Sequence, residues 1–477
     1  MGKIFVLGID GAFPEYFFGE WLNELPNIKR LIENGGYARL NSTIPPLSVV
    51  AWSSIYTGKS PADTGIFEYV QRKNFSYNDI HVITSKNLNE KTVWQIASDN
   101  NKKSVICYLI LTWPIKLFNG YLIGDTLAPS GENFQLTHPR ELKEEIKSFL
   151  GEFPPSTFSA FRDTSKNSNF REISKEESIE GIYDLTEKQI EVIKYMIKNK
   201  QWDLFFGIVG LSDRMNHAFW RYMDKGHRKY EKGSKFENAL RDYYKLVDKK
   251  IGELINLLDK DTKIIILSDH GITRMHTRVN LTDWLIKEGY MILKEPIKEK
   301  SVFKSEMVDW GKTKVFAIGA YEGQIFINLK GREPEGIIEK KDYDGIIEEL
   351  AEKLKQIKGD DGKILNTKIF RKKDFFMGKC EEISPDLIVY FDDLQYGCNT
   401  SLIGNETLWS PQTARGSDDA AHSQKGIFII KNNIFKNEDL GEISYLDVAP
   451  TILNELEIEI PKDMKGEIIK TKNKNVR

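Results

Sequence analysis

Seven polar side chains, spread over most of the chain, have the chemistry of a two-metal centre. They are three aspartates, three histidines and one serine: Asp10, Ser48, Asp213, His217, Asp269, His270 and His422. Carboxylate and imidazole ligands together suit Zn²⁺, Mn²⁺ or Fe²⁺ better than Ca²⁺ or Mg²⁺. Two such ions about 4 Å apart can clamp the attacking and leaving oxygens of an in-line displacement. The set therefore predicts two divalent metal ions, with Zn²⁺ preferred, around one activated hydroxyl that attacks phosphorus or sulfur.

Ser48 is the predicted nucleophile. It follows two prolines and starts a helix-like segment that stops at Gly58, so we expect Ser48 to cap this helix. A serine hydroxyl is a poor nucleophile at neutral pH and needs a metal ion or a base to activate it. A helix N-terminus also directs backbone N–H groups toward a bound anion.

The other six residues lie where a parallel sheet could gather them. Asp10 and Asp269 each follow an apolar run, and Asp213 follows a third, with His217 one helical turn later. We expect His422 in a polar loop before a further strand. Because ligands bind at the carboxyl ends of parallel strands, these side chains are expected to share one crevice.

Strand-like and helix-like stretches alternate along the chain. The expected strands are 4–9, 104–110, 204–209, 263–267, 387–391 and 426–430, and the expected helices are 26–35, 48–57, 139–150, 178–200 and 236–258. This alternation favours an α/β fold in which helices cover both faces of a mostly parallel sheet.

Two segments interrupt this order. Residues 151–177 are polar and contain a Pro-Pro pair, which indicates a loop or lid. Residues 284–375 have their own strand, strand, helix, strand order and are expected to form a small α+β insert, after which the chain returns to the main sheet near Leu387. The predicted catalytic core is thus discontinuous (1–283 and 376–470), and a flexible tail covers 471–477.

Composition sets limits on partners and compartment. The 68 basic and 70 acidic residues leave a net charge of −2, so no overall field indicates a nucleic-acid partner. The three cysteines, Cys107, Cys380 and Cys398, lack metal-type spacing and suggest reduced thiols in the cytoplasm. The first apolar run is too short for a signal peptide, and no run approaches the roughly 18 residues of a membrane span. The oligomeric state is left open.

Each signal has a plainer interpretation when it is taken alone. An aspartate after a strand is usually a turn or cap residue, and Asp269-His270-Gly271 could be a turn. His276 could compete with His270 as a ligand. The signals gain weight because they occur in one order along one predicted fold.

That order resembles the alkaline phosphatase superfamily, in its type I phosphodiesterase/nucleotide pyrophosphatase branch, and is most similar to prokaryotic proteins described as predicted phosphohydrolases or phosphomutases. The resembling stretches are 8–12, 25–31, 42–58, 268–271, 328–336, 384–389 and 447–453. The resemblance implies an alkaline-phosphatase-like three-layer core. It also implies that Asp213, His217 and His422 hold one metal, that Asp10, Asp269 and His270 hold the other, and that Ser48 bridges to it and forms a covalent phospho-enzyme.

Arg214, beside a predicted metal ligand, and Tyr69 are candidate substrate contacts, and Lys59, Arg72 and Arg415 are weaker candidates. Tyr69 occupies the place where the nucleotide pyrophosphatases carry an asparagine that donates to the phosphoryl oxygen, so nucleotide specificity is in question. The sulfatase Cys-x-Pro-x-Arg-type motif is absent around Ser48. The 152 residues between His270 and His422 argue against the cofactor-independent phosphoglycerate mutases.

The sequence thus predicts a dimetal hydrolase that cleaves phosphodiester or pyrophosphate bonds of a small molecule, with phosphomonoesters as a further substrate class. One alternative is a phosphomutase or phosphotransferase, in which an alcohol takes the phosphoryl group from Ser48. The alternative of another class is a non-catalytic ligand-binding protein on the same fold.

Overall fold

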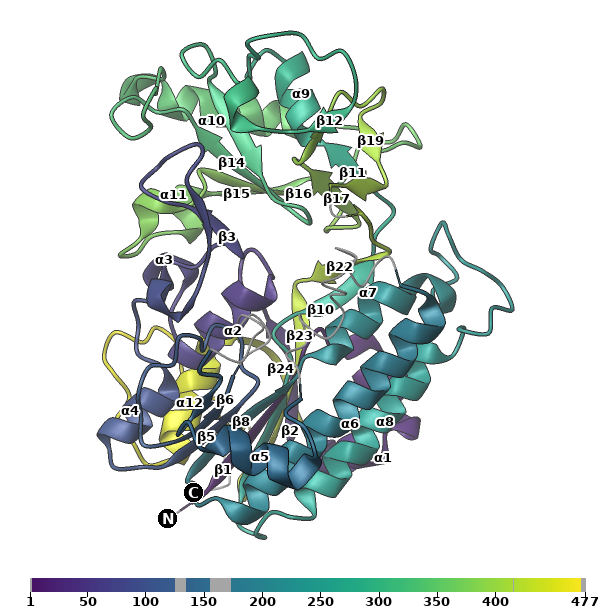
Figure 1. Ribbon diagram of the computed structural model, residues 1–477, viewed down its shortest axis with the longest axis vertical. Coiled ribbons are helices and arrows are strands. Elements are labelled where there is room, and N and C mark those ends of the chain that lie inside the picture. The colour runs from purple at the N-terminus through teal and green to yellow at the C-terminus, as the bar shows by residue number, and fades with distance from the viewer. Residues whose placement is uncertain (1, 125–133, 155–172, 415, 473–477) are drawn as a thin grey trace.

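The computed structural model describes residues 2–124, 134–154, 173–414 and 416–472. Nine strands of these residues form one sheet in the order β24-β2-β23-β9-β1-β8-β5-β6-β7 (Figure 1). Their bounds are β1 (Ile4–Ile9), β2 (Gly36–Asn41), β5 (Ser104–Cys107), β6 (Gly120–Ile123), β7 (Thr137–His138), β8 (Leu204–Val209), β9 (Lys263–Leu267), β23 (Lys425–Lys431) and β24 (Glu438–Ser444). The central strands pair in parallel, whereas β23 runs antiparallel to β2 and β9, and β7 runs antiparallel to β6. The expected α/β fold with a mostly parallel sheet is confirmed.

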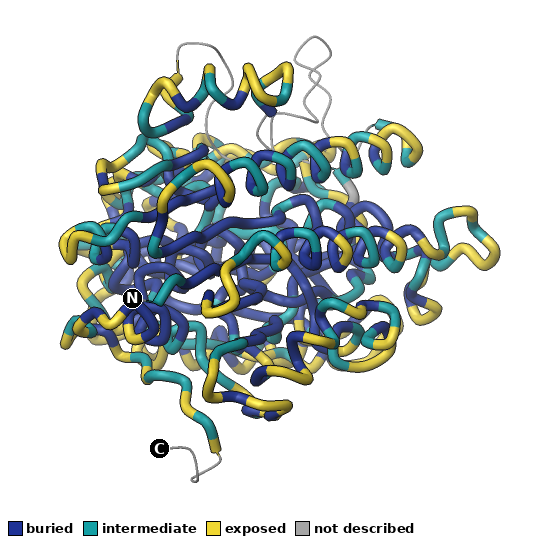
Figure 2. Tube along the Cα trace, turned by 90° about the horizontal axis from the view of Figure 1, so that it is seen from below, coloured by how far each residue is buried: buried dark blue, intermediate teal, exposed yellow. Residues whose placement is uncertain are grey.

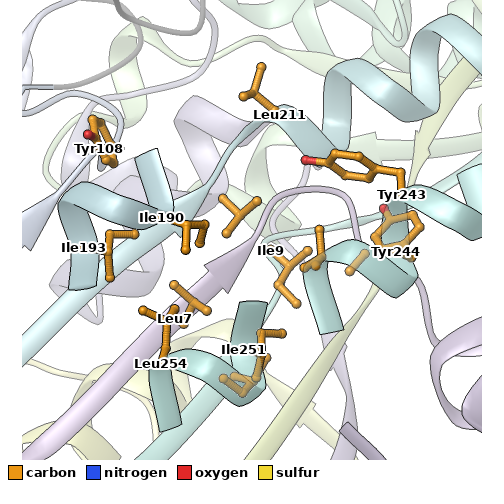
Figure 3. Packing of buried hydrophobic residues seen from close by; sticks show 14 of the residues in the cluster. Leu7, Ile9, Tyr108, Ile190, Ile193, Leu211, Tyr243, Tyr244, Ile251 and Leu254 are labelled. Atoms are coloured by element: carbon orange, nitrogen blue, oxygen red, sulfur yellow. The ribbon is translucent and has the colours of Figure 1, made fainter. Parts of the chain in front are cut away.

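The two faces of β1 belong to two separate hydrophobic cores. Phe5, Leu7 and Ile9 pack in one core, and Ile4 and Val6 in the other, because successive strand side chains point to opposite faces. The first core is covered by α1 (Pro26–Glu33), α5 (Leu142–Leu150), α6 (Lys175–Asn199), α7 (Leu211–Met223) and α8 (Ala239–Ile255), and the second by α2 (Ser48–Thr57), α4 (Val93–Asp99) and α12 (Val448–Glu455). Figure 3 shows β1 side chains packed among those of α6 and α8. Figure 2 shows that the buried residues lie in the interior and that the exposed residues lie on the outer helices and loops, as expected for a sheet covered on both faces.

A second unit lies above this core in Figure 1. It contains an antiparallel sheet in the order β13-β14-β16-β15, formed by β13 (Val315–Ile318), β14 (Gly323–Ile327), β15 (Lys368–Arg371) and β16 (Leu387–Tyr390). Its helices are α9 (Leu281–Lys287), α10 (Tyr343–Leu354) and α11 (Lys372–Phe375), and a three-stranded sheet joins β11 (Thr277–Asn280), β17 (Tyr396–Asn399) and β19 (Trp409–Ser410). The shorter strands of this unit are β12 (Ser301–Val302) and β18 (Leu402–Ile403), and β20 (Gln412–Thr413) and β21 (Gly416–Ser417) follow it in the chain.

The expected return to the main sheet near Leu387 is wrong. β16 pairs with β14 and β15 inside the second unit, and the chain rejoins the main sheet only at β23. A four-residue apolar run looks the same whichever sheet it enters, so the sequence pattern did not distinguish the two. We propose that the inserted unit spans about 277–410, from β11 to β19, between the two parts of the core.

Three further features concern the site. They are the hairpin of β3 (Val70–Arg72) and β4 (Ile80–Val82), the antiparallel pair of β10 (Gly271–Arg274) and β22 (Ala420–Ser423), and the short helix α3 (Pro61–Thr64). The five expected helices are present as α1, α2, α5, α6 and α8, with ends that shift by a few residues. The expected strand 104–110 stops at Cys107 because Tyr108 has a left-handed φ of 64°. Of the expected lid and tail, residues 155–172 and 473–477 lie outside the described residues. None of the described helices is both long and apolar enough to cross a membrane.

Candidate metal centre

Strand register brings Asp10 and Asp269 together. The parallel pairing of β1 with β9 aligns Gly8 with Leu267, so both aspartates lie two residues beyond the same pair. The backbone N–H of Gly11 donates to Oδ1 of Asp269 over 3.2 Å. The two carboxylates therefore meet at the carboxyl edge of the sheet, as the sequence predicted.

Trp52 holds Asp10 from the other side. Its indole Nε1 donates to Oδ2 of Asp10 over 2.9 Å. This approach depends on Gly8, since a Cβ atom there would lie 2.4 Å from the indole ring. The glycine thus lets α2 pack closely on β1 and orient the aspartate.

Ser48 points at the same place. Its Oγ lies 3.3 Å from Oδ1 of Asp10 and 3.1 Å from Nε2 of His270. The expected N-cap role is wrong: Leu47 occupies the N-cap position, and Ser48 is the first residue of α2 with its side chain directed at the carboxylate and the imidazole. The hydroxyl of Tyr69 also hydrogen-bonds to the Ser48 side chain.

The other three predicted ligands form a second group beside the first. Asp213 and His217 lie one turn apart on α7, and Oδ1 of Asp213 is 3.3 Å from Nε2 of His217. Nε2 of His422 lies 3.2 Å from Nε2 of His217 and 3.6 Å from Oδ1 of Asp213. His270 lies between the two groups, and its ring stacks on that of His422 with a centroid distance of 3.8 Å.

The expectation of a loop around His422 is wrong, because His422 lies in β22. This strand pairs with β10, and the register aligns His422 with Ile272. Since β10 begins directly after His270, the pairing carries His422 to the end of β9.

All three imidazoles present the same ring nitrogen to the centre. Each hydrogen-bonds through Nδ1 to an oxygen: His270 to Gly271 O at 2.9 Å, His422 to Pro46 O at 2.7 Å, and His217 to Asp418 Oδ1 at 2.9 Å. Because these oxygens accept, we assign a hydrogen to Nδ1 of each ring, which leaves Nε2 facing inward as the atom that would bind a metal. Imidazoles that bind a metal through Nε2 have this arrangement.

The charges also fit a pair of cations. Burial raises the pKa of Asp10, and the carboxylates of Asp269 and Asp213 raise it further. Burial likewise raises the pKa of Asp269, with Asp213 adding to the shift. Burial alone would lower the pKa of His217, but the carboxylates of Asp418 and Asp213 raise it to about 10. Concentrated buried carboxylates of this kind are stabilised by metal ions.

Two sets of ligand atoms are close enough to hold one ion each. The atoms of Asp10, Asp269 and His270 lie within 4.8 Å of one another, and so do those of Asp213, His270 and His422. The predicted ligand His217 adjoins the second set, with its Nε2 3.3 Å from Oδ1 of Asp213 and 3.2 Å from Nε2 of His422. Oδ2 of Asp269 is buried and accepts no hydrogen bond from the described residues. Oxygen and imidazole donors with this spacing suit Zn²⁺ or Mn²⁺.

The predicted substrate contacts divide between the centre and other places. Tyr69 touches Ser48, and burial raises its pKa, so the phenol stays protonated. Arg214 is half-buried on α7 beside Asp213. Lys59 lies outside the centre, because its Nζ pairs with Asp463 at 2.6 Å.

Two further candidates, a substrate contact and a competing metal ligand, lie away from the centre. Arg72 forms a buried ion pair with Glu333 at 2.8 Å. The ring of His276 lies 6.0 Å from that of Tyr396, and this histidine belongs to neither ligand set. Arg415 lies outside the described residues.

The sequence interpretation missed three residues at the centre. Trp52 lies four residues after Ser48 in α2, so helical spacing could have indicated it. Asp418 lies four residues before His422 in the same polar segment. Tyr321 comes from the inserted unit, and its hydroxyl donates to Oδ2 of Asp418 over 3.0 Å; no local signal marked it.

Comparison with solved structures supports the fold. The chain is similar to an inactive variant of murine ectonucleotide pyrophosphatase/phosphodiesterase 5 in complex with AMP, with a TM-score of 0.55, 13% identity, and coverage of 97% of this chain and 96% of that one. It is similar to the human protein of that name, with a TM-score of 0.54, 15% identity, and coverage of 96% of each chain. It is also similar to phosphonoacetate hydrolase from Sinorhizobium meliloti 1021 in complex with phosphonoformate, with a TM-score of 0.58, 15% identity, and coverage of 96% and 95%.

Comparison with curated proteins gave no significant match. The family model described as type I phosphodiesterase / nucleotide pyrophosphatase matches residues 4–410. This range contains six of the seven residues from which the prediction started, and it includes both Ser48 and the Asp269-His270 pair. With the fold, it confirms the expected place in the alkaline phosphatase superfamily. The chain belongs to the type I phosphodiesterase / nucleotide pyrophosphatase family.

Proposed function

We propose that this protein hydrolyses phosphodiester or pyrophosphate bonds of small molecules, with Ser48 as the nucleophile and two divalent cations, Zn²⁺ first, as cofactors. One observation carries the proposal: the Nε2 atoms of three histidines and the carboxylates of Asp10, Asp213 and Asp269 gather beside the Ser48 hydroxyl. Asp10, Asp269 and His270 would hold one cation, and Asp213, His217 and His422 the other. When bound, the cations would lower the pKa of the attacking hydroxyl and neutralise charge on the phosphoryl oxygens.

The side chains of the site have distinct roles in the proposed reaction. Asp10 and His270 orient the Oγ atom of Ser48, which attacks phosphorus, and the P–O bond to the leaving group breaks. Water then hydrolyses the phosphoseryl ester and restores the Ser48 hydroxyl. Tyr69, protonated beside Ser48, donates a hydrogen bond to a phosphoryl oxygen, where the nucleotide pyrophosphatases use an asparagine. Arg214 is proposed to contact the substrate.

Ligands of similar structures agree with a phosphoryl-binding site. The murine structure holds AMP, and the bacterial one holds phosphonoformate. Both molecules carry a phosphorus centre with anionic oxygens. We also propose a cytoplasmic location, in keeping with the three free cysteines.

The function is tested with purified protein and a panel of aryl phosphodiesters, aryl phosphomonoesters and nucleotides, each with Zn²⁺, Mn²⁺ or Mg²⁺. We expect Ser48→Ala to lower kcat by roughly 10³-fold or more, because the covalent route is lost, while metal content stays close to that of the parent. The matched control is Ser53→Ala on the same helix, since the Ser53 hydroxyl donates to Val50 O over 2.9 Å, away from the centre.

Three outcomes would contradict parts of this proposal. Parental turnover in Ser48→Ala would remove Ser48 as nucleophile. Phosphoryl transfer to an added alcohol in place of phosphate release would favour the phosphotransferase alternative. Absence of turnover on every ester, with ligand binding unchanged in Ser48→Ala, would favour a non-catalytic binding protein.

A further inference from the structure

We propose that Asp418 and Tyr321 are positioning residues that hold the His217 imidazole in its metal-binding orientation and make the inserted unit part of the centre. The inference rests on the metal centre of the proposed function. It concerns two side chains that would not bind a cation themselves.

Both carboxylate oxygens of Asp418 are already engaged. Oδ1 lies 2.9 Å from Nδ1 of His217, and Oδ2 accepts from the hydroxyl of Tyr321 over 3.0 Å. Only 1% of the Asp418 side chain is exposed. A buried carboxylate on the far ring nitrogen fixes the tautomer and raises the basicity of Nε2, and such partners typically account for 10- to 100-fold in metal affinity.

Tyr321 covers two of the imidazoles. Its ring centroid lies 4.7 Å from that of His422 and 5.5 Å from that of His217. Tyr321 therefore contacts Asp418 through its hydroxyl and the histidines through its ring. Rotation of either imidazole would have to displace this tyrosine.

The inserted unit holds Tyr321 in place. Ala320, the preceding residue, accepts a backbone hydrogen bond from Cys398 over 3.0 Å. Two residues after Tyr321 the chain enters β14, which pairs with β13 and β16. Tyr321 thus lies in the turn between two paired strands, and through it the inserted unit reaches the ligand set of Asp213, His217 and His422.

Asp419 provides a matched comparison. It is the next residue and is similarly buried, but its carboxylate pairs with Lys229 at 2.9 Å and with Arg221 at 3.7 Å. Comparison of Asp418→Asn with Asp419→Asn therefore separates the general effect of losing a buried carboxylate from the specific effect on His217.

The experiment measures Zn²⁺ affinity by chelator competition, without substrate, in the parent, Asp418→Asn, Asp419→Asn and Tyr321→Phe. We expect Asp418→Asn to weaken one of the two binding steps by about 10- to 100-fold and to leave the other unchanged. Tyr321→Phe keeps the ring and loses one hydrogen bond, so we expect a loss of up to about tenfold at the same step. Asp419→Asn should bind both ions as the parent does.

Metal-free unfolding curves of the variants show whether each one folds. Parental affinities in both Asp418→Asn and Tyr321→Phe would overturn the inference, and so would an equal loss in Asp419→Asn. A parent that binds two ions but cleaves no phosphate ester would overturn the proposed function alone, because the affinities would still report on Asp418. A parent that binds no ion would overturn both.

Discussion

At the scale of single residues, Glu322 has an unusual environment next to Tyr321. Its side chain is 1% exposed, and Oε1 accepts a hydrogen bond from Gln324 over 3.0 Å. Burial raises the pKa of Glu322 from 4.5 to about 7, although the hydrogen bond from Gln324 opposes the shift. Gln324 also donates to the backbone oxygen of Phe67 over 2.9 Å, two residues before Tyr69. The protonation of Glu322 is therefore linked to packing close to the centre.

We expect the contribution of Glu322 to the stability of the protein to fall as pH rises from about 4.5 to 7. An acid whose pKa is higher in the folded state binds its proton more tightly there, so its contribution is present at low pH and lost as pH passes the folded pKa. The shift corresponds to a loss on the order of 3 kcal/mol. Urea unfolding across this pH range should show that Glu322→Gln removes this part of the loss.

The control is Glu335→Gln, because Glu335 is exposed. It should leave the pH profile of unfolding unchanged. Parallel profiles for the parent and Glu322→Gln would contradict the raised pKa.

At the scale of elements, the β3–β4 hairpin joins the core to the inserted unit. Arg72 donates two hydrogen bonds to Glu333, at 2.8 and 3.2 Å. Its guanidinium lies 4.6 Å from the ring centroid of Phe326. Tyr77 stacks on Trp310 with a centroid distance of 3.7 Å. Since β3 starts directly after Tyr69, this docking also places the tyrosine beside Ser48.

Arg72→Ala is expected to lower the free energy of unfolding by about 1–3 kcal/mol, because it removes two hydrogen bonds to the buried carboxylate of Glu333, which keeps its hydrogen bond from Arg332. Chemical unfolding of the purified variant measures this loss. The matched change Lys73→Ala should cost less than about 0.5 kcal/mol, since Lys73 and Asp79 are exposed and 3.9 Å apart. A stable Arg72→Ala variant with strongly reduced turnover would instead return Arg72 to the substrate contacts.

At the scale of the whole molecule, the centre is built from segments that begin at Asp10 and end at His422. The core supplies the candidate ligands, and the inserted unit supplies Tyr321. Cations that bind only this folded arrangement must stabilise the entire chain. We therefore expect metal content and global stability to be coupled.

Removal of divalent cations with a chelator is expected to lower the melting temperature, and Zn²⁺ is expected to restore it. Each occupied site adds about 2.7 kcal/mol when the free ion is at 100 times its Kd. Asp269→Asn should show a smaller stabilisation by Zn²⁺, because one ligand set is damaged. Calorimetry of both proteins with and without Zn²⁺ provides the measurement, and an equal melting temperature of the parent in both conditions would contradict the centre.

Much of the core could be predicted because its signals are local. The bounds of β1, β8 and β9 coincide with continuous apolar runs. Helix α2 ends just before Gly58, which adopts the left-handed conformation with φ of 66°. Strand ends in a parallel sheet meet at one edge, so Asp10 and Asp269 could be placed together before any coordinates were known. The order of the motifs along the chain was sufficient to predict the family.

What the sequence alone determined was therefore the α/β class, the central strands and the identity of the seven clustered side chains. Only the tertiary structure decided that His422 lies on a strand, that β16 belongs to the inserted unit, and that Asp418 and Tyr321 support His217. Lys59 forms an ion pair with Asp463 and Arg72 with Glu333, and both carboxylates are far away in the chain. The physical reason is the same for all of these: a strand's partner or a charged group's counter-ion is chosen by packing between distant segments, and a residue's own neighbours in sequence do not encode that choice.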